Sequence, residues 1–284
     1  MQTEPPWRYL GWKILEQTIQ PQNVGMTANI WTLNDVQKLL GNINWIQTQC
    51  AIDNATLTPP FDLLQGDTDI NAPQSWTPEA QQALQIINDK LSNQQCHRRS
   101  EDIPLTLFVC NQEEQPLAII GQWDPRRNDP LVILEWVFLP HQPTKTIATR
   151  IEMFADLIKK GRERIVELAG EEPTLIVLPI VKTYLTWSIQ NSLELQLALA
   201  GFSGKLDTHL PPHKRFTFYY NVKIENRPLC QRQPVDGRTV FTDGSGKSGK
   251  AVVTWEENGV WKREGEILHG SPQIVELHAV IMAF

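Results

Sequence analysis

The chain has 284 residues, of which 41% are apolar and 20% charged, and its formal net charge is −6. This composition excludes a disordered or fibrous protein and predicts two or more globular domains. The acidic balance is unusual for a protein that binds nucleic acid, so any such binding needs local basic patches.

The first hundred residues begin with predicted strands and continue with helices. A strand hairpin is expected from Trp7–Ile14 and Thr18–Pro21. From about 27 to 97 the apolar spacing is helical. Thr32 can cap a helix, with Asp35 three residues later in a variant of the capping box. The buried face of this helix is predicted to hold Leu33, Val36, Leu40, Ile43 and Ile46.

A second stripe on the same helix is polar and contains a glycine. Gln37, Gly41, Asn44 and Trp45 follow one another at i, i+4, i+7 and i+8. Glycine inside a helix costs about 1 kcal/mol relative to alanine, which suggests that something approaches closely there. One interpretation is contact with the minor groove of a nucleic-acid duplex. The other is close packing on a neighbouring helix at Gly41, with Trp45 in the core.

Two further helices are expected before residue 100. Residues 59–66, which start with two prolines and end with glycine, predict a short helix. Thr77-Pro78-Glu79 is a strong start signal, with a cap, proline at the first helical position and an acid in the first turn. Leu84, Ile87 and Leu91 are the expected buried residues of the helix that follows.

From about residue 103 the pattern changes to short strands, at 105–110, 117–123 and 131–139. A helix at about 145–161, a strand at 174–178 and a helix near 182–190 follow. This order predicts an α/β layer with a mixed sheet.

Residues 225–238 are polar, with two prolines and a glycine, and resemble a linker. Strands are then expected at 239–243, 250–256 and 260–268, and a helix begins near Ser271. The segments 106–111 and 239–244 are similar, and both open three strands followed by a helix. If the two are related copies, Cys110 occupies the place of Asp243.

Two carboxylates in the C-terminal segment are candidates for a metal site. Asp243 is expected at the end of a strand and Glu276 on the following helix. Mg²⁺ prefers carboxylate oxygens, with Mn²⁺ as an alternative, and two such ions can cleave a phosphodiester. Gly244 would let a phosphate backbone approach, next to Ser245, and Gln273 lies one helical turn before Glu276. Each acid alone is more readily explained as an ordinary turn or surface residue. The ordered set of Asp243, Gln273 and Glu276 on a strand and the following helix favours a functional site.

Other features of the sequence are less informative. The basic runs at 98–99, 126–127 and 159–164 are best interpreted as solvated faces. The four cysteines, Cys50, Cys96, Cys110 and Cys230, are too widely spaced to indicate zinc or a disulfide framework. The N-terminus does not resemble a signal peptide and no apolar run could span a membrane, so an intracellular protein is expected.

Together these segments resemble the reverse transcriptase and RNase H polymerase of betaretrovirus-like, K-type endogenous retroviruses. Residues 33–45 are very similar to the thumb helix that tracks the minor groove, and Tyr9-Leu10-Gly11 looks like the primer grip. The resemblance implies a multi-domain α/β chain. Its parts would be the end of the palm (1–26), a helical thumb (27–100), an RNase H-like connection domain (101–225), a linker (226–238) and a partial RNase H domain (239–284).

The resemblance also implies roles for individual residues. Asp243 and Glu276 match the first two metal-binding acids, and Gln273 matches a residue that contacts the hybrid. Gln37, Gly41 and Trp45 match the minor-groove track. The expected ligands are Mg²⁺ and an RNA–DNA hybrid or duplex, and the expected protein partner is a polymerase homo- or heterodimer.

The sequence has no Tyr-x-Asp-Asp motif, and the last two RNase H acids would lie beyond Phe284. We therefore expect a truncated polymerase segment that is inactive alone. Its ancestral functions would be RNA-directed DNA synthesis and RNA removal from hybrids, and it would be associated with virions in the parent virus. The alternatives are a non-catalytic nucleic-acid-binding module and a relic that only pairs with a polymerase, in the cytoplasm or nucleus. The helix after Ser271 would leave Leu277, Val280, Ile281 and Phe284 uncovered, so this last domain should fold poorly.

Overall fold

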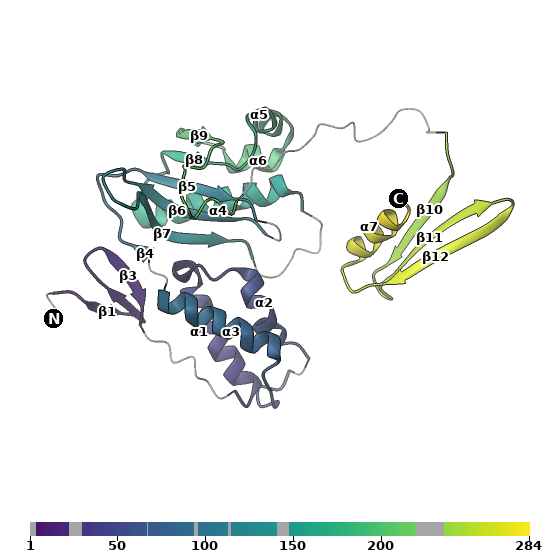
Figure 1. The fold of residues 1–284 in the computed structure, drawn as a ribbon, viewed down its shortest axis with the longest axis horizontal. Coiled ribbons are helices and arrows are strands. Elements are labelled where there is room, and N and C mark those ends of the chain that lie inside the picture. Colours follow the sequence, from purple (N-terminus) through teal and green to yellow (C-terminus); the bar gives the residue numbers. More distant parts are fainter. Residues whose placement is uncertain are drawn as a thin grey trace. The chain divides into compact units, whose positions relative to one another are not determined.

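The computed structural model describes residues 4–22, 30–66, 68–93, 96–112, 115–140, 148–219 and 236–284. The chain forms two compact units, which are described separately (Figure 1). Unit 1 comprises Met1–His141 and Arg150–Lys223, and unit 2 comprises Gln142–Thr149 and Ile224–Phe284. The proposed linker at 226–238 lies largely outside the described residues, and the domain boundaries stay predictions.

Unit 1 begins with a small antiparallel sheet, in which β1 (Trp7–Tyr9), β2 (Trp12–Ile14), β3 (Thr18–Pro21) and β4 (Cys96–His97) lie in that order. The single strand predicted over 7–14 is wrong, because the chain turns at Leu10 and Gly11. Both residues have positive φ, 44° and 84°, as in the tight two-residue turns that join antiparallel strands. Tyr9 therefore pairs with Trp12.

Helix α1 (Leu33–Cys50) confirms the predicted start and the predicted buried face. The Thr32 hydroxyl accepts from the Asp35 backbone N–H, and the Asp35 carboxylate accepts from the Thr32 backbone N–H, which completes the capping box. All five residues expected to be buried are in the core, and Leu39, Gln47 and Cys50 join them.

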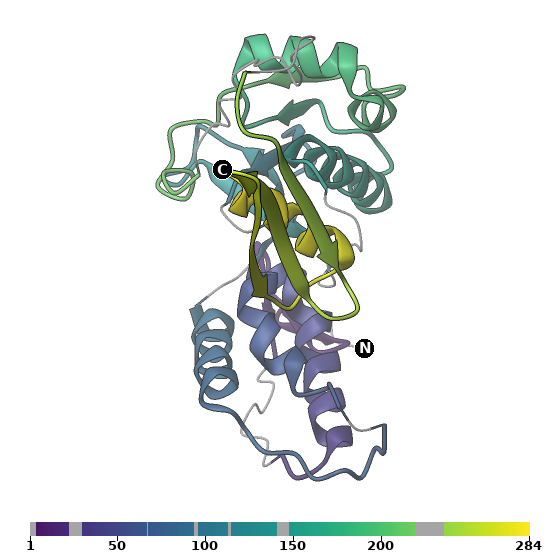
Figure 2. The same ribbon diagram turned by 90° about the vertical axis from the view of Figure 1, so that its right-hand side faces the viewer.

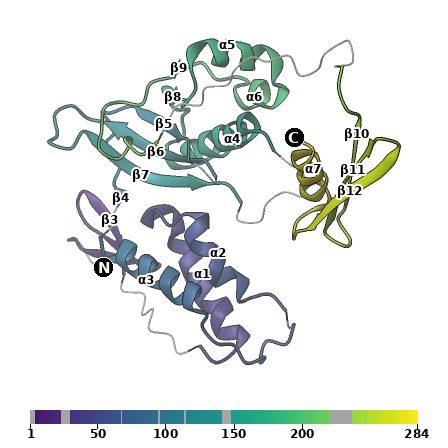
Figure 3. The same cartoon turned by 45° about the vertical axis from the view of Figure 1, so that its right-hand side comes forward.

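Helices α2 (Asn54–Asp62) and α3 (Pro78–Asn93) pack together beside α1 (Figure 3). The predicted start of α2 at Pro59 is wrong, because Asp53 caps the helix and accepts from the Thr56 backbone N–H at 2.8 Å. Both prolines lie inside the helix instead. The predicted start of α3 is confirmed, since the Thr77 hydroxyl accepts from the Ala80 backbone N–H. Ile87 is fully buried, and Leu84 and Leu91 are partly buried against the same core.

The centre of unit 1 is a five-stranded sheet in the order β7-β6-β5-β8-β9. Strands β5 (Leu105–Cys110), β6 (Leu117–Trp123) and β7 (Leu131–Phe138) are antiparallel, while β8 (Leu175–Val177) and β9 (Lys205–Asp207) add parallel pairs. This mixed sheet confirms the predicted α/β layer. Side chains alternate between the two faces of each strand, so both faces of the sheet carry an apolar cluster.

Helix α4 (Arg150–Ala169) covers one face of this sheet and is longer than predicted. The expected end at Gly161 is wrong, because Gly161 is where the helix packs on the sheet. A Cβ atom at Gly161 would lie 2.5 Å from a methyl carbon of Leu107. The helix ends at Gly170, whose φ of 70° suits glycine. The expected helix α5 (Lys182–Asn191) is confirmed, whereas α6 (Leu193–Ala198) and β9 were not predicted.

Unit 2 confirms three predicted strands and the helix. Strands β10 (Val240–Ser245), β11 (Lys250–Glu257) and β12 (Val260–Ile267) form an antiparallel meander, and α7 (Pro272–Met282) lies on one face (Figure 2). Among the described residues of this unit, Ala251, Val275 and Ala279 form a small buried cluster, and Val253 is also buried. As expected, Leu277, Val280, Ile281 and Phe284 are exposed.

Candidate nucleic-acid interface and carboxylate pair

The polar stripe on α1 is exposed along its whole length. Gln37, Gly41, Asn44 and Trp45 all face solvent, and the Trp45 side chain is 60% exposed. A Cβ atom added at Gly41 would meet no atom within 4 Å. The interpretation that Gly41 packs on a neighbouring helix, with Trp45 in the core, is therefore wrong.

A second exposed aromatic residue stands at the start of the same helix. Trp31 precedes the cap and is 72% exposed, and its backbone N–H donates to the Asp35 carboxylate. Sequence reasoning missed this residue because the apolar period begins only at Leu33. The cap signal at Thr32 places Trp31 just outside the helix and could have identified it.

The turn between β1 and β2 presents two large side chains to solvent. Tyr9 and Leu10 are 64% and 63% exposed. Leu10 also has φ of 44°, a left-handed conformation that costs a residue other than glycine about 1–2 kcal/mol. An apolar side chain held in this conformation at an exposed turn is a candidate for contact with a ligand. Gly11 completes the turn.

Asp243 and Glu276 come from β10 and α7, and both are exposed. Asp243 does not end its strand as predicted; β10 continues to Ser245, and Asp243 pairs with Val252. Gly244 packs against the helix backbone, where an added Cβ would lie 2.5 Å from the Glu276 nitrogen. The space beside Gly244 is thus filled by α7, which corrects the idea that a phosphate enters there.

The alternation of side chains along β10 fixes how the two acids relate to each other. Gly244 faces α7, so Asp243 belongs to the opposite face of the sheet. Its carboxylate accepts from the Gly244 backbone N–H at 2.9 Å. The Glu276 backbone, in contrast, lies against the face of β10 on which a Gly244 side chain would stand. Ser245 and Gln273 are also exposed, at the end of β10 and in the first turn of α7.

The donor chemistry of this pair suits a hard divalent cation, because carboxylate oxygens are the ligands that Mg²⁺ and Mn²⁺ prefer. Over the described ranges, no group of three or more His, Cys, Asp and Glu side chains could hold a metal ion. Asp243 and Glu276 therefore stay candidate ligands by the type of their side chains alone.

The matching position in unit 1 has different chemistry. Both β5–β7 and β10–β12 are antiparallel meanders followed by a helix, which agrees with the internal similarity of the sequence. Cys110, in the place of Asp243, is completely buried, and burial raises the pKa of its thiol. Cys50, Cys96 and Cys110 are free thiols, and Cys230 is outside the described residues.

Most of the basic residues noted in the sequence are engaged within unit 1. Arg126 pairs with Asp102 and Asp124, both at 2.9 Å. Arg164 pairs with Glu135 at 3.0 Å. Burial raises the pKa of Glu135, and the Arg164 guanidinium only partly offsets this increase. These pairs support the interpretation of the basic runs as structural surface.

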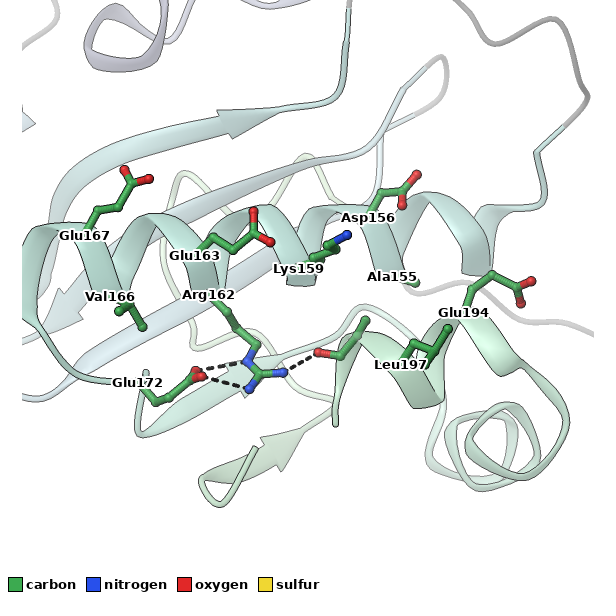
Figure 4. A pocket seen from close by; sticks show the side chains of 11 residues that line it. Ala155, Asp156, Lys159, Arg162, Glu163, Val166, Glu167, Glu172, Glu194 and Leu197 are labelled. Atoms are coloured by element: carbon green, nitrogen blue, oxygen red, sulfur yellow. Dashed lines mark hydrogen bonds and ion pairs between the residues drawn. The ribbon is translucent and has the colours of Figure 1, made fainter. Parts of the chain in front are cut away.

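A groove of about 830 Å³ between α4 and α6 has the wrong charge for a phosphate backbone (Figure 4). Five acids and two bases line it, and one base, Arg162, is bound by Glu172 and the Ala198 carbonyl. The groove residues are Ala155, Asp156, Lys159, Arg162, Glu163, Val166, Glu167, Glu172, Glu194, Leu197 and Ala198. Nucleic acid is therefore expected on other faces of unit 1.

The helical group and the mixed sheet of unit 1 match two domains of retroviral polymerases. Residues 21–85 match the reverse transcriptase thumb domain, and residues 113–216 match the ERVK-8-like, RNaseH-like domain. The chain belongs to the retroviral polymerase family of the betaretrovirus type.

Individual relatives match along almost the whole chain. The Gag-Pro-Pol polyprotein of squirrel monkey retrovirus is 33% identical over 100% of this chain and 15% of its own length. That of mouse mammary tumor virus (strain BR6) is 32% identical over 98% of this chain and 15% of its own length. Mason-Pfizer monkey virus gives 31% identity over 99% of this chain and 15% of the polyprotein. The chain thus spans about 15% of the length of these relatives.

Proposed function

We propose that this chain holds an RNA–DNA hybrid or duplex through α1 and the β1–β2 turn. The observation that carries the proposal is the open stripe on α1, where Gly41 has no neighbour within 4 Å. A helix that accepts glycine at an exposed interior position gives up stability, and packing within the chain does not explain the choice. Close approach of a ligand backbone at Gly41 explains the choice of glycine.

The side chains of the stripe suit the minor groove of a hybrid. The amides of Gln37 and Asn44 can donate to base and sugar acceptors there, and the Trp45 ring can lie along the sugars. Gly41 leaves room for the strand between them. Tyr9 and Leu10 provide a second contact on the same unit, at the turn that ends with Gly11.

In unit 2, Asp243 and Glu276 would hold Mg²⁺, with Mn²⁺ as the alternative. When bound, the ion activates water and stabilises a leaving oxygen during hydrolysis of RNA in a hybrid. Ser245 and Gln273 would position the strand beside the two acids. The sequence has no Tyr-x-Asp-Asp motif, so we infer binding without DNA synthesis. Because no group of three or more metal-ligating side chains stands among the described residues, we also infer little or no hydrolysis by this chain alone.

A second candidate function is pairing with a polymerase, as a homo- or heterodimer. The exposed apolar side chains of Trp187, Leu193 and Leu197 on α5 and α6 favour it. We place either function in the cytoplasm or nucleus, or in the virion of the parent virus. Within the described ranges, no helix is both long and apolar enough to cross a bilayer.

The test is a labelled RNA–DNA hybrid mixed with the full chain in Mg²⁺, read for binding by anisotropy and for cleavage on a gel. Asp243→Asn serves as the matched control. We expect binding by both chains and no cleavage above the control. Cleavage that the substitution abolishes would contradict the proposal of an inactive chain. Absence of hybrid binding would overturn the binding function and favour pairing with a polymerase.

A further inference from the structure

A polar cavity of about 410 Å³ lies in unit 1, and none of its lining residues belongs to the α1 stripe. Its walls come from the end of α3, from β4, from the turn between β6 and β7, and from the segment near Arg215. The polar lining residues are Asn93, His97, Arg127, Asn128, Asp129 and Arg215.

Two arginines and one acid line this cavity, so its lining has more positive than negative side chains. The Asp129 carboxylate is already engaged by His213 Nε2 at 2.8 Å and by Lys214 Nζ at 3.3 Å. Arg127 donates to a neutral acceptor, Gln17 Oε1, at 3.5 Å. The neighbouring Arg126, in contrast, is held by two carboxylates.

A histidine, His97, also lines this cavity. Burial lowers the pKa of His97 most, and the charges of Arg127 and Arg215 lower it further, against a hydrogen bond with the Ile133 backbone and the charge of Asp129. The His97 Nδ1 atom is buried and has no hydrogen-bond partner in the described part of the chain. A buried polar atom without a partner is rare and is costly unless a ligand or water satisfies it.

We propose that this cavity binds a phosphate group. Guanidinium groups match the geometry of phosphate oxygens and bind them with short, charge-assisted hydrogen bonds. The side-chain amide of Asn128 adds a neutral donor at the rim, and the Asn93 amide, which already donates one N–H to the Asp89 carbonyl, has a second N–H. The phosphate could come from a free anion, such as pyrophosphate or a nucleotide, or from a nucleic-acid strand.

The test titrates inorganic pyrophosphate into the full chain by calorimetry, without duplex, so that it is independent of hybrid binding. Arg127→Gln is compared with Arg126→Gln, the same substitution one residue away, outside the cavity. Loss of one charge-assisted contact should weaken binding about tenfold in Arg127→Gln. Binding by Arg126→Gln should stay within about twofold of the unchanged chain.

A second variant, Asn128→Asp, adds a negative charge at the exposed rim and should also weaken binding. Equal losses in Arg126→Gln and Arg127→Gln would indicate diffuse attraction and overturn the proposal, as would no pyrophosphate binding at all. Competition by a 5′-phosphorylated oligonucleotide, with its unphosphorylated form beside it, identifies the source. Displacement by the phosphorylated form alone assigns the pocket to a strand end, displacement by both forms assigns it to the phosphodiester backbone, and displacement by neither assigns it to a free anion.

Discussion

Asp53 links two helices of the thumb through a single carboxylate. It caps α2 by accepting from the Thr56 backbone N–H, and it pairs with Lys90 of α3 at 2.8 Å. Burial opposes its ionisation, but the hydrogen bonds from Lys90 and Thr56 outweigh burial and lower its pKa below 3.8. The folded state therefore binds this proton less readily than the unfolded state.

This shift predicts a pH-dependent contribution to stability. The contribution is present above the unfolded pKa of about 4 and is lost as the pH falls through the lowered folded value. Asp53→Asn keeps a capping acceptor and removes the charge, so its difference in unfolding free energy from the unchanged chain should shrink on acidification. Urea unfolding at pH 7 and below pH 4 measures it.

Asp53→Ala, the companion variant, also loses the cap and should cost about 1 kcal/mol more than Asp53→Asn at both pH values. A difference between Asp53→Asn and the unchanged chain that does not vary with pH would contradict this account of the ion pair.

At the scale of elements, two helical glycines have opposite surroundings. Gly161 of α4 faces the buried Leu107, whereas Gly41 of α1 faces open space. Alanine raises helix propensity by about 1 kcal/mol at either site. At Gly161, however, the new methyl group overlaps the Leu107 side chain, and overpacking costs about 1–3 kcal/mol.

Gly161→Ala should therefore destabilise unit 1 by about 1 kcal/mol, while Gly41→Ala stabilises it by about 0.5–1 kcal/mol. Chemical denaturation of both variants measures the two changes. A gain in stability at Gly161 would show that α4 does not rest on the sheet at this residue.

These helices also show which features the sequence could predict and which it could not. Caps and periodic apolar faces are local, so Thr32, Thr77 and the faces of α1 and α3 were predictable. Gly161 suggested a helix end because its partner, Leu107, is distant in the sequence. The strand β4 was missed for the same reason, since it pairs with β3 across most of the thumb.

The candidate sites show the same difference between local patterns, which the sequence predicts, and contacts between distant residues, which it does not. Periodicity placed the stripe of Gln37, Gly41, Asn44 and Trp45 on one face, but it left open whether that face was buried. The acids Asp243 and Glu276 were found from the strand and helix pattern. The contact between Gly244 and the α7 backbone depends on how the helix packs, which one sequence pattern does not determine.

At the scale of the whole molecule, the two units differ in how much apolar surface they bury. Unit 1 has three extensive clusters, whereas the described part of unit 2 has one cluster of three small or medium buried side chains. Large side chains of unit 2, including Phe241, Trp261, Ile281 and Phe284, remain exposed. Regions with few buried apolar contacts open at low free energy.

Hydrogen exchange in the full chain should therefore divide along the units. Backbone amides of β10–β12 and α7 should exchange much faster than those of β5–β7 and α4, as read by mass spectrometry of peptides. Equal protection of both units would contradict this account and would indicate that the exposed apolar side chains of unit 2 are covered in solution.

The central claim is that the exposed stripe on α1 contacts a nucleic-acid duplex, and Gly41→Leu tests it most directly. Leucine is a better helix former than glycine and meets no neighbour at this site, so stability should rise by up to about 1 kcal/mol. Affinity for a labelled RNA–DNA hybrid, measured on the same sample, should nevertheless fall at least about tenfold, because the side chain blocks close approach. The hybrid affinity of Gly41→Ala should lie between that of the unchanged chain and that of Gly41→Leu. A Gly41→Leu chain that is more stable and binds the hybrid unchanged would contradict the claim.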